Sequence, residues 1–472
     1  MNPLLKATAT AAQIAEGVKA GTVKARAVID ACLDRIAAHN DTLGAFTEVT
    51  VARAREAADR IDGMVANGVE VGPLAGVPFS AKNLFDIKGV TTLAGSKINA
   101  DNPPARADAT LIARLEAAGA VLVGAVNMGE YAYDFTGENA HHGPSRNPHA
   151  LDHMSGGSSG GSASCVAGGL TPLSLGSDTN GSIRVPSSLC GLFGLKPTYG
   201  RLSRAHTFPF VASLDHLGPF ARSATDLALA YDAMQGFDEA DPAQTKRPHE
   251  RTVSRLRHPV PGLRIGIADG YFIGDEEVQA HVQHVAKALD ASRTVSLPDV
   301  PSARAAAFLI TMAEGAALHL DRLRARPDDF DPDTRDRLLA GAMLPAAWID
   351  KAQKLRRAWR DKVLPLFDDF DAILAPSTPM KAPLIGQKTA SFAGVEMPVR
   401  PNLGIYAQPI SFIGLPVCAV PVWLPGAELP LGVQVIAPPW REDLALRIAH
   451  QLETSGACAA PVAKQFAETD DD

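Results

Sequence analysis

The chain has 472 residues, of which 46 % are hydrophobic and 21 % charged, and this balance excludes wholesale disorder. The net charge of −7 argues against a general nucleic-acid binder, and no apolar run is long enough to span a membrane. Five scattered cysteines, none paired as C-x-x-C, indicate neither a disulfide framework nor a cysteine-based zinc site. We therefore expect a soluble, cytoplasmic protein, and length alone suggests about three domains.

The first part of the chain predicts helices followed by an α/β unit. Residues 1–65 carry apolar side chains at helical spacing, as at Ile14, Val18 and Ile29. A short apolar run bounded by glycine and proline predicts a strand within 73–85. A helix over 108–118 and a buried strand over 120–124 follow. The order strand, helix, strand indicates an α/β fold.

The rest of the chain predicts further strands and helices around loops. Residues 137–162 form a polar loop, followed by a short helix over 163–169 and a strand over 171–175. The polar, basic stretch from 240 to 261 predicts a surface linker between two halves. Beyond it we expect strands at 263–267, 372–376, 417–420 and 431–436, helices at 278–289 and 444–452, and a frayed acidic tail.

Glycine is concentrated in one segment. Eleven glycines fall within residues 156–200, against about four expected from the chain's average usage. The segment contains Gly-Gly-Ser158-Ser-Gly-Gly-Ser and then Gly-Ser-Asp-Thr-Asn-Gly-Ser182-Ile-Arg. Glycine lets a backbone approach a ligand closely, and the interleaved serines place hydroxyls on that backbone. The combination favours a site that aims several N–H groups at one atom.

Four interpretations of this segment compete. A phosphate cradle would need G-x-x-x-x-G-K-[ST], which is absent, and the loop has no basic residue. An α/β-hydrolase elbow matches Gly156-x-Ser158-x-Gly160, but a polar run precedes it where that elbow needs a strand. A flexible linker rarely lies between strand-like segments in mid-domain. A hydrolase with two serines and a lysine base from elsewhere fits best.

The serine motifs resemble those of the amidase signature family. Gly76-Val-Pro-Phe-Ser-Ala-Lys82, Gly191-Leu-Phe-Gly-Leu-Lys-Pro-Thr198 and the tract Leu429 to Trp440 also match its pattern, so the resemblance covers about residues 70–456. It implies amide hydrolysis without cofactor or metal, in an α/β fold with a central mixed sheet covered by helices on both faces. The expected organisation is a helical N-terminal segment over 1–68 for oligomer or partner contact, one catalytic domain over 69–462, and an acidic tail over 463–472.

By matching positions, the resemblance implies that Ser182 is the nucleophile, that Ser158 follows a cis peptide and relays a proton, and that Lys82 is the base. The oxyanion hole would consist of backbone N–H groups from Thr179, Asn180, Gly181 and Ser182. Asp178 and Arg184 would form a supporting ion pair, with Ser159 beside them. Two positions depart from the family pattern, Asn83 after the lysine and Asn180 before the nucleophile, and they put the pocket's shape in question.

A lysine can act as a base only if its pKa falls, because the free side chain is charged at neutral pH. Lys82 lies among apolar residues that include Val77, Phe79 and Phe85. Lowering its pKa by about 3 units requires about 4 kcal/mol of destabilisation of the charged form, which burial can supply. We therefore expect Lys82 to be buried.

Within the family, the stretch from Lys82 to Asn99 and the tract Gln408 to Phe412 most resemble the branch that hydrolyses 1-carboxybiuret. This implies a small, anionic, biuret-like substrate, release of ammonia, and a small helical partner subunit in a homodimer or heterotetramer, with no direct nucleic-acid or membrane contact. The alternatives are the glutaminase chain of a tRNA amidotransferase and a broad aryl-amide or carbamate hydrolase. A non-catalytic scaffold would not need an intact set of three catalytic residues.

An anionic substrate requires a cation, and Arg335 and Arg337 are the candidates, although exposure is the default expectation for arginine. Met128, Tyr131 and Gln408 complete the expected substrate contacts. The histidines at 141, 142, 149 and 153 match no metal motif, so we expect solvated or capping side chains. Cys165 and Cys190 flank the serines in sequence and are expected to be small core residues.

Overall fold

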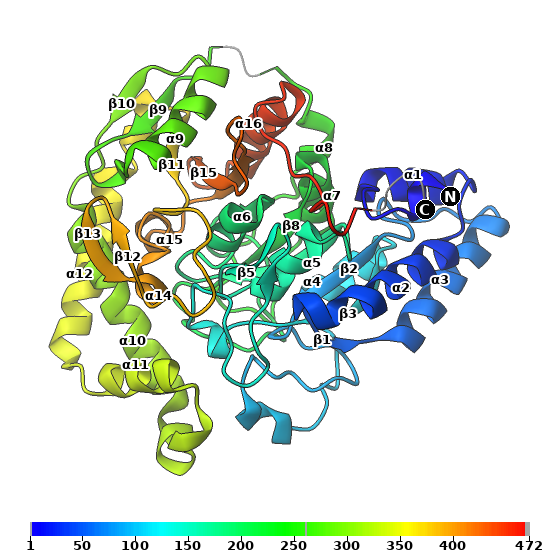
Figure 1. Cartoon of the computed structure of the whole chain (residues 1–472), viewed down its shortest axis with the longest axis horizontal. Coiled ribbons are helices and arrows are strands. Elements are labelled where there is room, and N and C mark those ends of the chain that lie inside the picture. Colours follow the sequence, from blue (N-terminus) through cyan, green and yellow to red (C-terminus); the bar gives the residue numbers. More distant parts are fainter. Residues whose placement is uncertain (1, 260–261, 468–472) are drawn as a thin grey trace.

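The computed structural model describes residues 2–259 and 262–467, and its centre is an eleven-stranded mixed sheet (Figure 1). The strand order is β1-β3-β2-β6-β8-β7-β14-β15-β11-β9-β10. In that order the strands span Phe46–Val49, Val121–Val126, Pro78–Lys82, Leu173–Asp178, His216–Ala221, Phe193–Lys196, Val417–Val422, Leu431–Ile436, Ala372–Pro376, Ile265–Ala268 and Arg293–Val295. β2 pairs parallel with β3 and β6, whereas β6, β8, β7, β14 and β15 pair antiparallel in sequence along the sheet. The predicted α/β class with a mixed sheet is confirmed.

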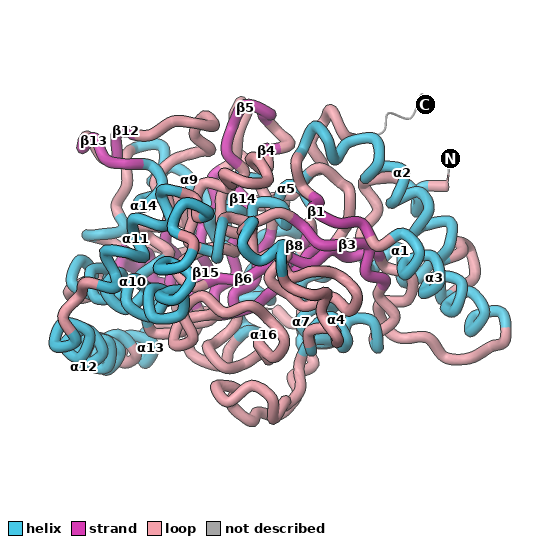
Figure 2. Tube along the Cα trace, turned by 90° about the horizontal axis from the view of Figure 1, so that it is seen from below, coloured by secondary structure: helices cyan, strands magenta, loops and turns pink. Residues whose placement is uncertain are grey.

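Helices cover the sheet from both sides. α5 (Gly160–Ala167) and α6 (Arg184–Cys190) contact each other, as do α7 (Ala224–Met234) and its neighbours α4 (Thr110–Ala117) and α16 (Glu442–Thr454). Figure 2 shows α4, α7 and α16 on one side of the strands and α5 on the other. β6, β14 and β15 are buried along their whole length, as expected for strands enclosed between two helical layers.

The N-terminal segment joins the main sheet. α2 (Ala25–Leu43) packs against α3 (Val51–Ala66), both contact β3, and α1 (Ala11–Lys19) contacts α7. Between α2 and α3, β1 pairs antiparallel with β3 and forms one edge of the sheet. The all-helical prediction for residues 1–65 missed β1, because four residues are too few to show a period of two. The division at residue 68 stays a prediction.

A helical block that was not among the predicted elements lies beside the second half of the sheet (Figure 1). It consists of α10 (Val300–Ala325), α11 (Pro332–Ala342) and α12 (Ala346–Val363), with α13 (Leu366–Asp369) after it. α10 packs on α11, on α12 and on α15 (Gln408–Phe412). None of the helices among the described residues is both long enough and apolar enough to cross a bilayer.

Several predicted boundaries need correction. The strand expected within 73–85 is only Pro78–Lys82, the one at 171–175 is Leu173–Asp178, and the helix at 163–169 is Gly160–Ala167. β7 and β8 were missed, and the loop at 137–162 holds a hairpin of β4 (Arg146–Asn147) and β5 (Ala150–Met154). Glycine disfavours helices, so Gly160 and Gly161 indicated a loop, but tertiary packing overrides that preference. The strands at 372–376 and 431–436 are confirmed.

The remaining elements complete the second half of the chain. They are α8 (Thr252–Arg255), α9 (Glu276–Ala288), α14 (Val399–Asn402) and a two-stranded ribbon of β12 (Thr389–Phe392) and β13 (Val395–Pro398). α9 and α16 agree with the helices expected at 278–289 and 444–452 to within two residues. Most of the predicted acidic tail, from 468 onward, lies outside the described residues.

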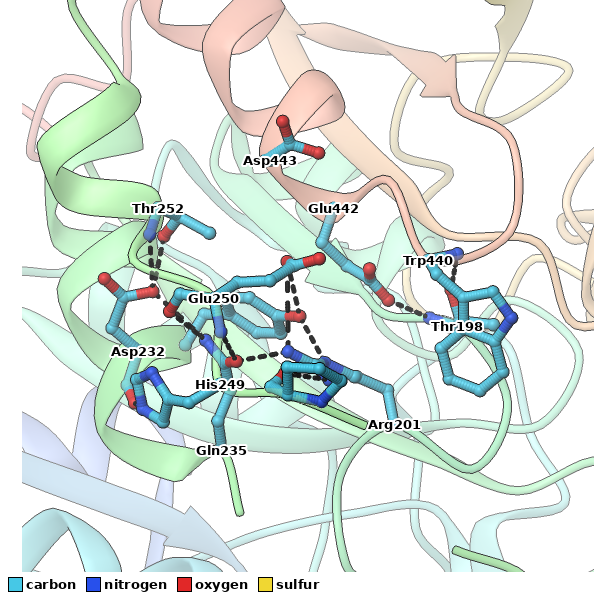
Figure 3. Close-up of polar contacts among 12 residues, drawn as sticks. Thr198, Arg201, Asp232, Gln235, His249, Glu250, Thr252, Trp440, Glu442 and Asp443 are labelled. Carbon is cyan, nitrogen blue, oxygen red and sulfur yellow. Dashed lines mark hydrogen bonds and ion pairs between the residues drawn. The ribbon is translucent and has the colours of Figure 1, made fainter. Parts of the chain in front are cut away.

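The basic stretch expected as a linker between two halves does not separate two sheets, because β9, β10 and β11 belong to the same sheet as β7 and β8. Its end at 260–261 lies outside the described residues. Figure 3 shows how Glu250 is held: its N donates to Gln235 Oε1 over 2.7 Å. In addition, Tyr231 Oη donates to a Glu250 carboxylate oxygen over 3.3 Å. Nearby, Arg247 lies over the ring of Trp440 at 4.5 Å.

The partly buried carboxyl of Glu250 predicts that the free energy of unfolding depends on pH. Burial, and secondarily the nearby Glu442, raises the pKa of Glu250 to about 7 despite the opposing Arg201. The folded state therefore favours the protonated carboxyl, a contribution that is complete below pH 4.5 and is lost as the pH rises through about 7. We expect Glu250→Gln to raise the melting temperature at pH 8 and to leave it unchanged at pH 4. Thermal unfolding at both pH values checks this, and an equal effect at both would contradict it.

Candidate active site

Lys82 is fully buried at the end of β2 and lies against three serine hydroxyls. Its Nζ donates to Ser158 Oγ over 2.7 Å, to Ser177 Oγ over 2.9 Å and to Ser159 Oγ over 3.1 Å. Burial lowers the pKa of Lys82 to about 7, although the carboxylates of Asp215, Asp178 and Asp134 act in the opposite direction. A substantial fraction of this amine is therefore neutral at neutral pH, as a base requires.

Ser158 follows a cis peptide bond from Gly157, so the conformation that the family resemblance implied is present. Glycine is required at 157, because a Cβ there would lie 2.4 Å from Asp134 Oδ2. Gly157 N donates to Phe135 O over 2.8 Å, and Ser158 O accepts from Gly129 N over 3.1 Å. The serine is thus held between backbone segments that follow β3.

The turn from 178 to 184 carries Ser182 and is closed by the predicted ion pair. Arg184, at the start of α6, donates to both carboxylate oxygens of Asp178 at 3.0 and 2.9 Å, and both side chains are fully buried. Arg184 also donates to Ala407 O, to Gln434 Oε1 and to Ser411 Oγ. Burial acts to raise the pKa of Asp178, but Arg184 outweighs it and holds that pKa well below its ordinary value. The pair fixes both ends of the turn.

The turn leaves its backbone donors free. Within the described chain, the N–H groups of residues 179–182 donate no hydrogen bond, and Gly181 has a φ of +139° that favours glycine. Phe135, which accepts from Gly157, has its ring 3.5 Å from where a Gly181 Cβ would lie, so the two serine segments are neighbours. No hydrogen bond joins Ser182 Oγ to Ser158 or Lys82 among the described residues. The structure therefore joins Lys82 to Ser158 by a hydrogen bond. Ser182 is related to that pair only because the segment that carries it lies beside the segment that carries Ser158.

Ser182 opens onto a small cavity of about 20 Å³. Thr179, Asn180 and Gln408 line it together with aromatic side chains and Thr311 of α10. Arg337 of α11 also lines it; its Nη1 donates to Tyr133 O over 3.3 Å and its guanidinium lies 5.2 Å from the Tyr133 ring centroid. A space of this size holds about one water.

Three predicted substrate contacts do not line this cavity. Tyr131 is buried in an aromatic cluster, with its ring centroid 3.9 Å from that of His319, and Met128 is also buried. Arg335 pairs with Asp336 at 3.0 Å on the outer side of α11. An α-helix advances about 100° per residue, so Arg335 and Arg337 point in different directions and only Arg337 lines the cavity.

The predicted histidines and cysteines are not part of the site. His141 bonds Glu130 at 3.0 Å, His153 bonds Asp152 at 2.7 Å, and His149 packs edge-on against Trp423. Among the described residues, no group of three histidines, cysteines or acids could hold a metal ion. All five cysteines are buried and free, which confirms that Cys165 and Cys190 belong to the core.

Comparison with known proteins gives the family. Residues 27–446 match the family described as Amidase. The chain belongs to the amidase family. It is 53 % identical over 448 residues to AtzE of Pseudomonas sp. (strain ADP), which belongs to a 1-carboxybiuret hydrolase, and the match covers 94 % of this chain and 98 % of that one. It is 38 % identical to one of the subunits of the glutamyl-tRNA(Gln) amidotransferase of Azotobacter vinelandii, covering 94 % and 96 %.

Solved structures agree with this assignment. A chain from a vestigial protein complex, described as revealing the evolutionary origins of an s-triazine catabolic enzyme, superposes with a TM-score of 0.95 and 52 % identity. That match covers 96 % of this chain and 99 % of the other. A bacterial aryl acylamidase superposes with a TM-score of 0.86 and 27 % identity, covering 97 % of each chain. The protein is thus an amidase, a hydrolase of C–N bonds, and several of its relatives are subunits of complexes.

Sequence reasoning missed three residues at this amidase site. Ser177 is the third hydroxyl on Lys82, and it stands inside the quoted serine motif, so its position could have been noticed. Asp134 accepts from the N–H groups of Thr136 and Gly137 and shapes the loop beside Gly157. Thr311 reaches the cavity from α10, 129 residues after Ser182, and no local signal marks it.

Proposed function

We propose that this amidase hydrolyses a C–N bond of a small biuret-like amide, 1-carboxybiuret above all, and releases ammonia. The observation that carries the mechanism is the buried Lys82 amine, whose Nζ contacts Ser158 Oγ at 2.7 Å. The identity of 53 % to a chain of a 1-carboxybiuret hydrolase supports the substrate. Asn180, where the family pattern has glycine, argues against a glutaminase.

In the proposed reaction, neutral Lys82 takes a proton from Ser158, which takes one from Ser182 as its Oγ bonds to the carbonyl carbon. The carbonyl oxygen becomes an oxyanion and accepts hydrogen bonds from the unused N–H groups of residues 179–182; one such donor is typically worth about 2.7–4 kcal/mol. The proton returns to the leaving nitrogen, the C–N bond breaks, and ammonia departs. Water then attacks the acyl-enzyme, releases the acid and restores Ser182.

The experiment that tests this proposal is a screen for released ammonia. Purified protein is given 1-carboxybiuret, biuret, glutamine and an aryl amide, each with and without a co-expressed small neighbouring protein. We expect turnover of the biuret-type compounds, with Ser182→Ala as the inactive control. Turnover of glutamine alone would replace the substrate assignment, and normal activity of Ser182→Ala would overturn the mechanism.

The pH dependence of kcat/KM should follow Lys82. Its pKa is lowered to about 7, and only the neutral amine can act as a base. We therefore expect kcat/KM to rise with pH through a midpoint near 7 and to level off above it. Initial rates from pH 5 to 9 measure this, and a midpoint near 10, the ordinary lysine value, would contradict the assignment.

We propose that Arg337 binds the carboxylate of an anionic substrate. Loss of a hydrogen bond to a charged group costs about 1.5–3 kcal/mol, so Arg337→Met should raise KM about 10- to 100-fold for 1-carboxybiuret. Biuret, which has no carboxylate, should show a smaller change. Arg335→Met is the matched control, because Arg335 lies on the same helix and pairs with Asp336 outside the cavity. Equal losses for both variants would contradict the proposal.

We also propose a small helical partner subunit, in a homodimer or heterotetramer that contacts residues 1–68. Relatives that are named as subunits support a partner in general. Five free, buried cysteines fit action in the reducing cytoplasm. Light scattering of the protein alone and with its co-expressed neighbour would measure the assembly, and an unchanged monomer in both would contradict it.

A further inference from the structure

The side-chain amide of Asn180 is fixed at one end and unsatisfied at the other. Its Nδ2 donates to Thr311 Oγ1 of α10 over 2.9 Å. Its Oδ1 is buried and accepts no hydrogen bond among the described residues. Only 6 % of Asn180 is exposed, and the residue lines the cavity onto which Ser182 opens. The acceptor is therefore held next to the reacting serine with no donor of the protein's own.

An unpaired buried acceptor is costly. Leaving a buried carbonyl oxygen without a donor costs about 1–3 kcal/mol, and such groups are rare in folded proteins. Glycine at position 180, as in the family pattern, would remove this cost entirely. The Asn180 carbonyl is therefore available to a donor that arrives from outside the chain, either a water in the cavity or an N–H of the substrate.

Two other polar groups on the cavity wall complement this acceptor. Gln408 Oε1 accepts from Arg304 Nε over 3.2 Å. The N–H groups of the Gln408 amide donate no hydrogen bond to the described residues, so they can donate to a substrate in the cavity. Arg337 contributes a positive charge. The wall thus combines an acceptor, a donor and a cation. A ureido chain that ends in a carboxylate presents the opposite set: an N–H, a carbonyl oxygen and an anion.

We propose that Asn180 Oδ1 accepts a hydrogen bond from the N–H on the acyl side of the scissile carbonyl, and so selects ureides over ordinary carboxamides. The carbonyl of a ureide carries nitrogen on both sides, whereas a carboxamide has carbon on the acyl side. This inference rests on the proposed function and names the substrate class of the same site. Thr311 is a positioning residue in this proposal, because its Oγ1 accepts from Asn180 Nδ2 and orients the amide.

The test uses two substrates that differ at the group on the acyl side of the scissile carbonyl. Biuret and malonamide have the same number and connectivity of non-hydrogen atoms, with N–H in one and CH₂ in the other between the two carbonyls. The ratio of their kcat/KM values measures how much the acyl-side N–H contributes to binding of the transition state. We expect the wild-type ratio to favour biuret, and Asn180→Gly to reduce that ratio at least tenfold, as expected for loss of one hydrogen bond in a buried site.

Thr311 provides variants that retain Asn180. Thr311→Val removes the acceptor that orients the amide and should also reduce the ratio, whereas Thr311→Ser keeps the hydroxyl and should preserve it. Calorimetric binding of both compounds to Ser182→Ala, with and without Asn180→Gly, gives the same comparison without turnover. A ratio unchanged by Asn180→Gly in both measurements overturns the role of Asn180 and leaves the proposed function standing. A wild-type enzyme that turns over malonamide but no ureide overturns both.

Discussion

Replacing Ser182 by alanine, or Lys82 by methionine, is expected to lower kcat by about 10⁵-fold, and the double variant should lose little more. The two groups act in one proton transfer, so removing either abolishes the same step. Lys82→Arg should not restore activity, because arginine stays protonated in proteins. Single-turnover rates of ammonia release, with circular dichroism to confirm folding, measure these effects. Losses that multiply in the double variant would show that the residues act independently.

Lys196 supplies a matched control for burial alone. It is also fully buried, and burial lowers its pKa to about 7. Its Nζ donates to the backbone carbonyls of Pro197 and Leu415 rather than to hydroxyls. We expect Lys196→Met to change stability and to leave the proton transfer intact in the folded fraction. Comparing Lys82→Met with Lys196→Met therefore separates the effect of losing any buried lysine from the effect of losing the lysine that contacts the serine hydroxyls.

Replacing Arg184 by methionine is expected to lower the free energy of unfolding by about 3–5 kcal/mol. The substitution leaves the buried Asp178 carboxylate without its ion-pair partner, and it also removes the donors to Ala407 O and Gln434 Oε1. Urea unfolding measures the loss. Arg184→Lys should recover only part of it, because an ammonium cannot reproduce the paired contacts of a guanidinium.

A double-mutant cycle tests the reason for that loss. If the cost arises from the uncompensated carboxylate, Asp178→Asn combined with Arg184→Met should be less destabilised than the sum of the single variants. Full additivity would mean that the pair contributes through other contacts. Activity should fall with either variant even where the protein stays folded, because the pair fixes both ends of the turn that carries Ser182.

The family of this protein could be predicted from the sequence better than the bounds of its strands and helices. Lys82, Ser158 and the Asp178–Arg184 pair stand in dense local motifs, and the structure brings them together as expected. Strands enclosed on both faces, such as β11 and β15, are short continuous apolar runs and were recognised at their true bounds. The family assignment accordingly depended on motifs rather than on periodicity.

The parts that were missed depend on contacts far apart in the chain. α10 and α11 mix alanine and charge without a distinct apolar stripe, so the packing of α10 on α15 could not be predicted. Arg335 and Arg337 could not be separated in sequence, because which one lines the cavity depends on how α11 is rotated. Met128 and Tyr131 were drawn from a segment whose neighbours do line the cavity, but their own side chains pack elsewhere.

The small cavity at Ser182 has two walls of different origin. Thr179, Asn180 and Ser182 come from the turn that follows β6 of the sheet, whereas Thr311 and Arg337 come from α10 and α11. Substitutions in the helical block can therefore change which substrates bind, while the segments attached to the sheet keep Lys82, Ser158 and Ser182 in place. A single scaffold can in this way acquire new amide substrates by exchange of one contiguous stretch of chain, about 40 residues long by the span of those two helices.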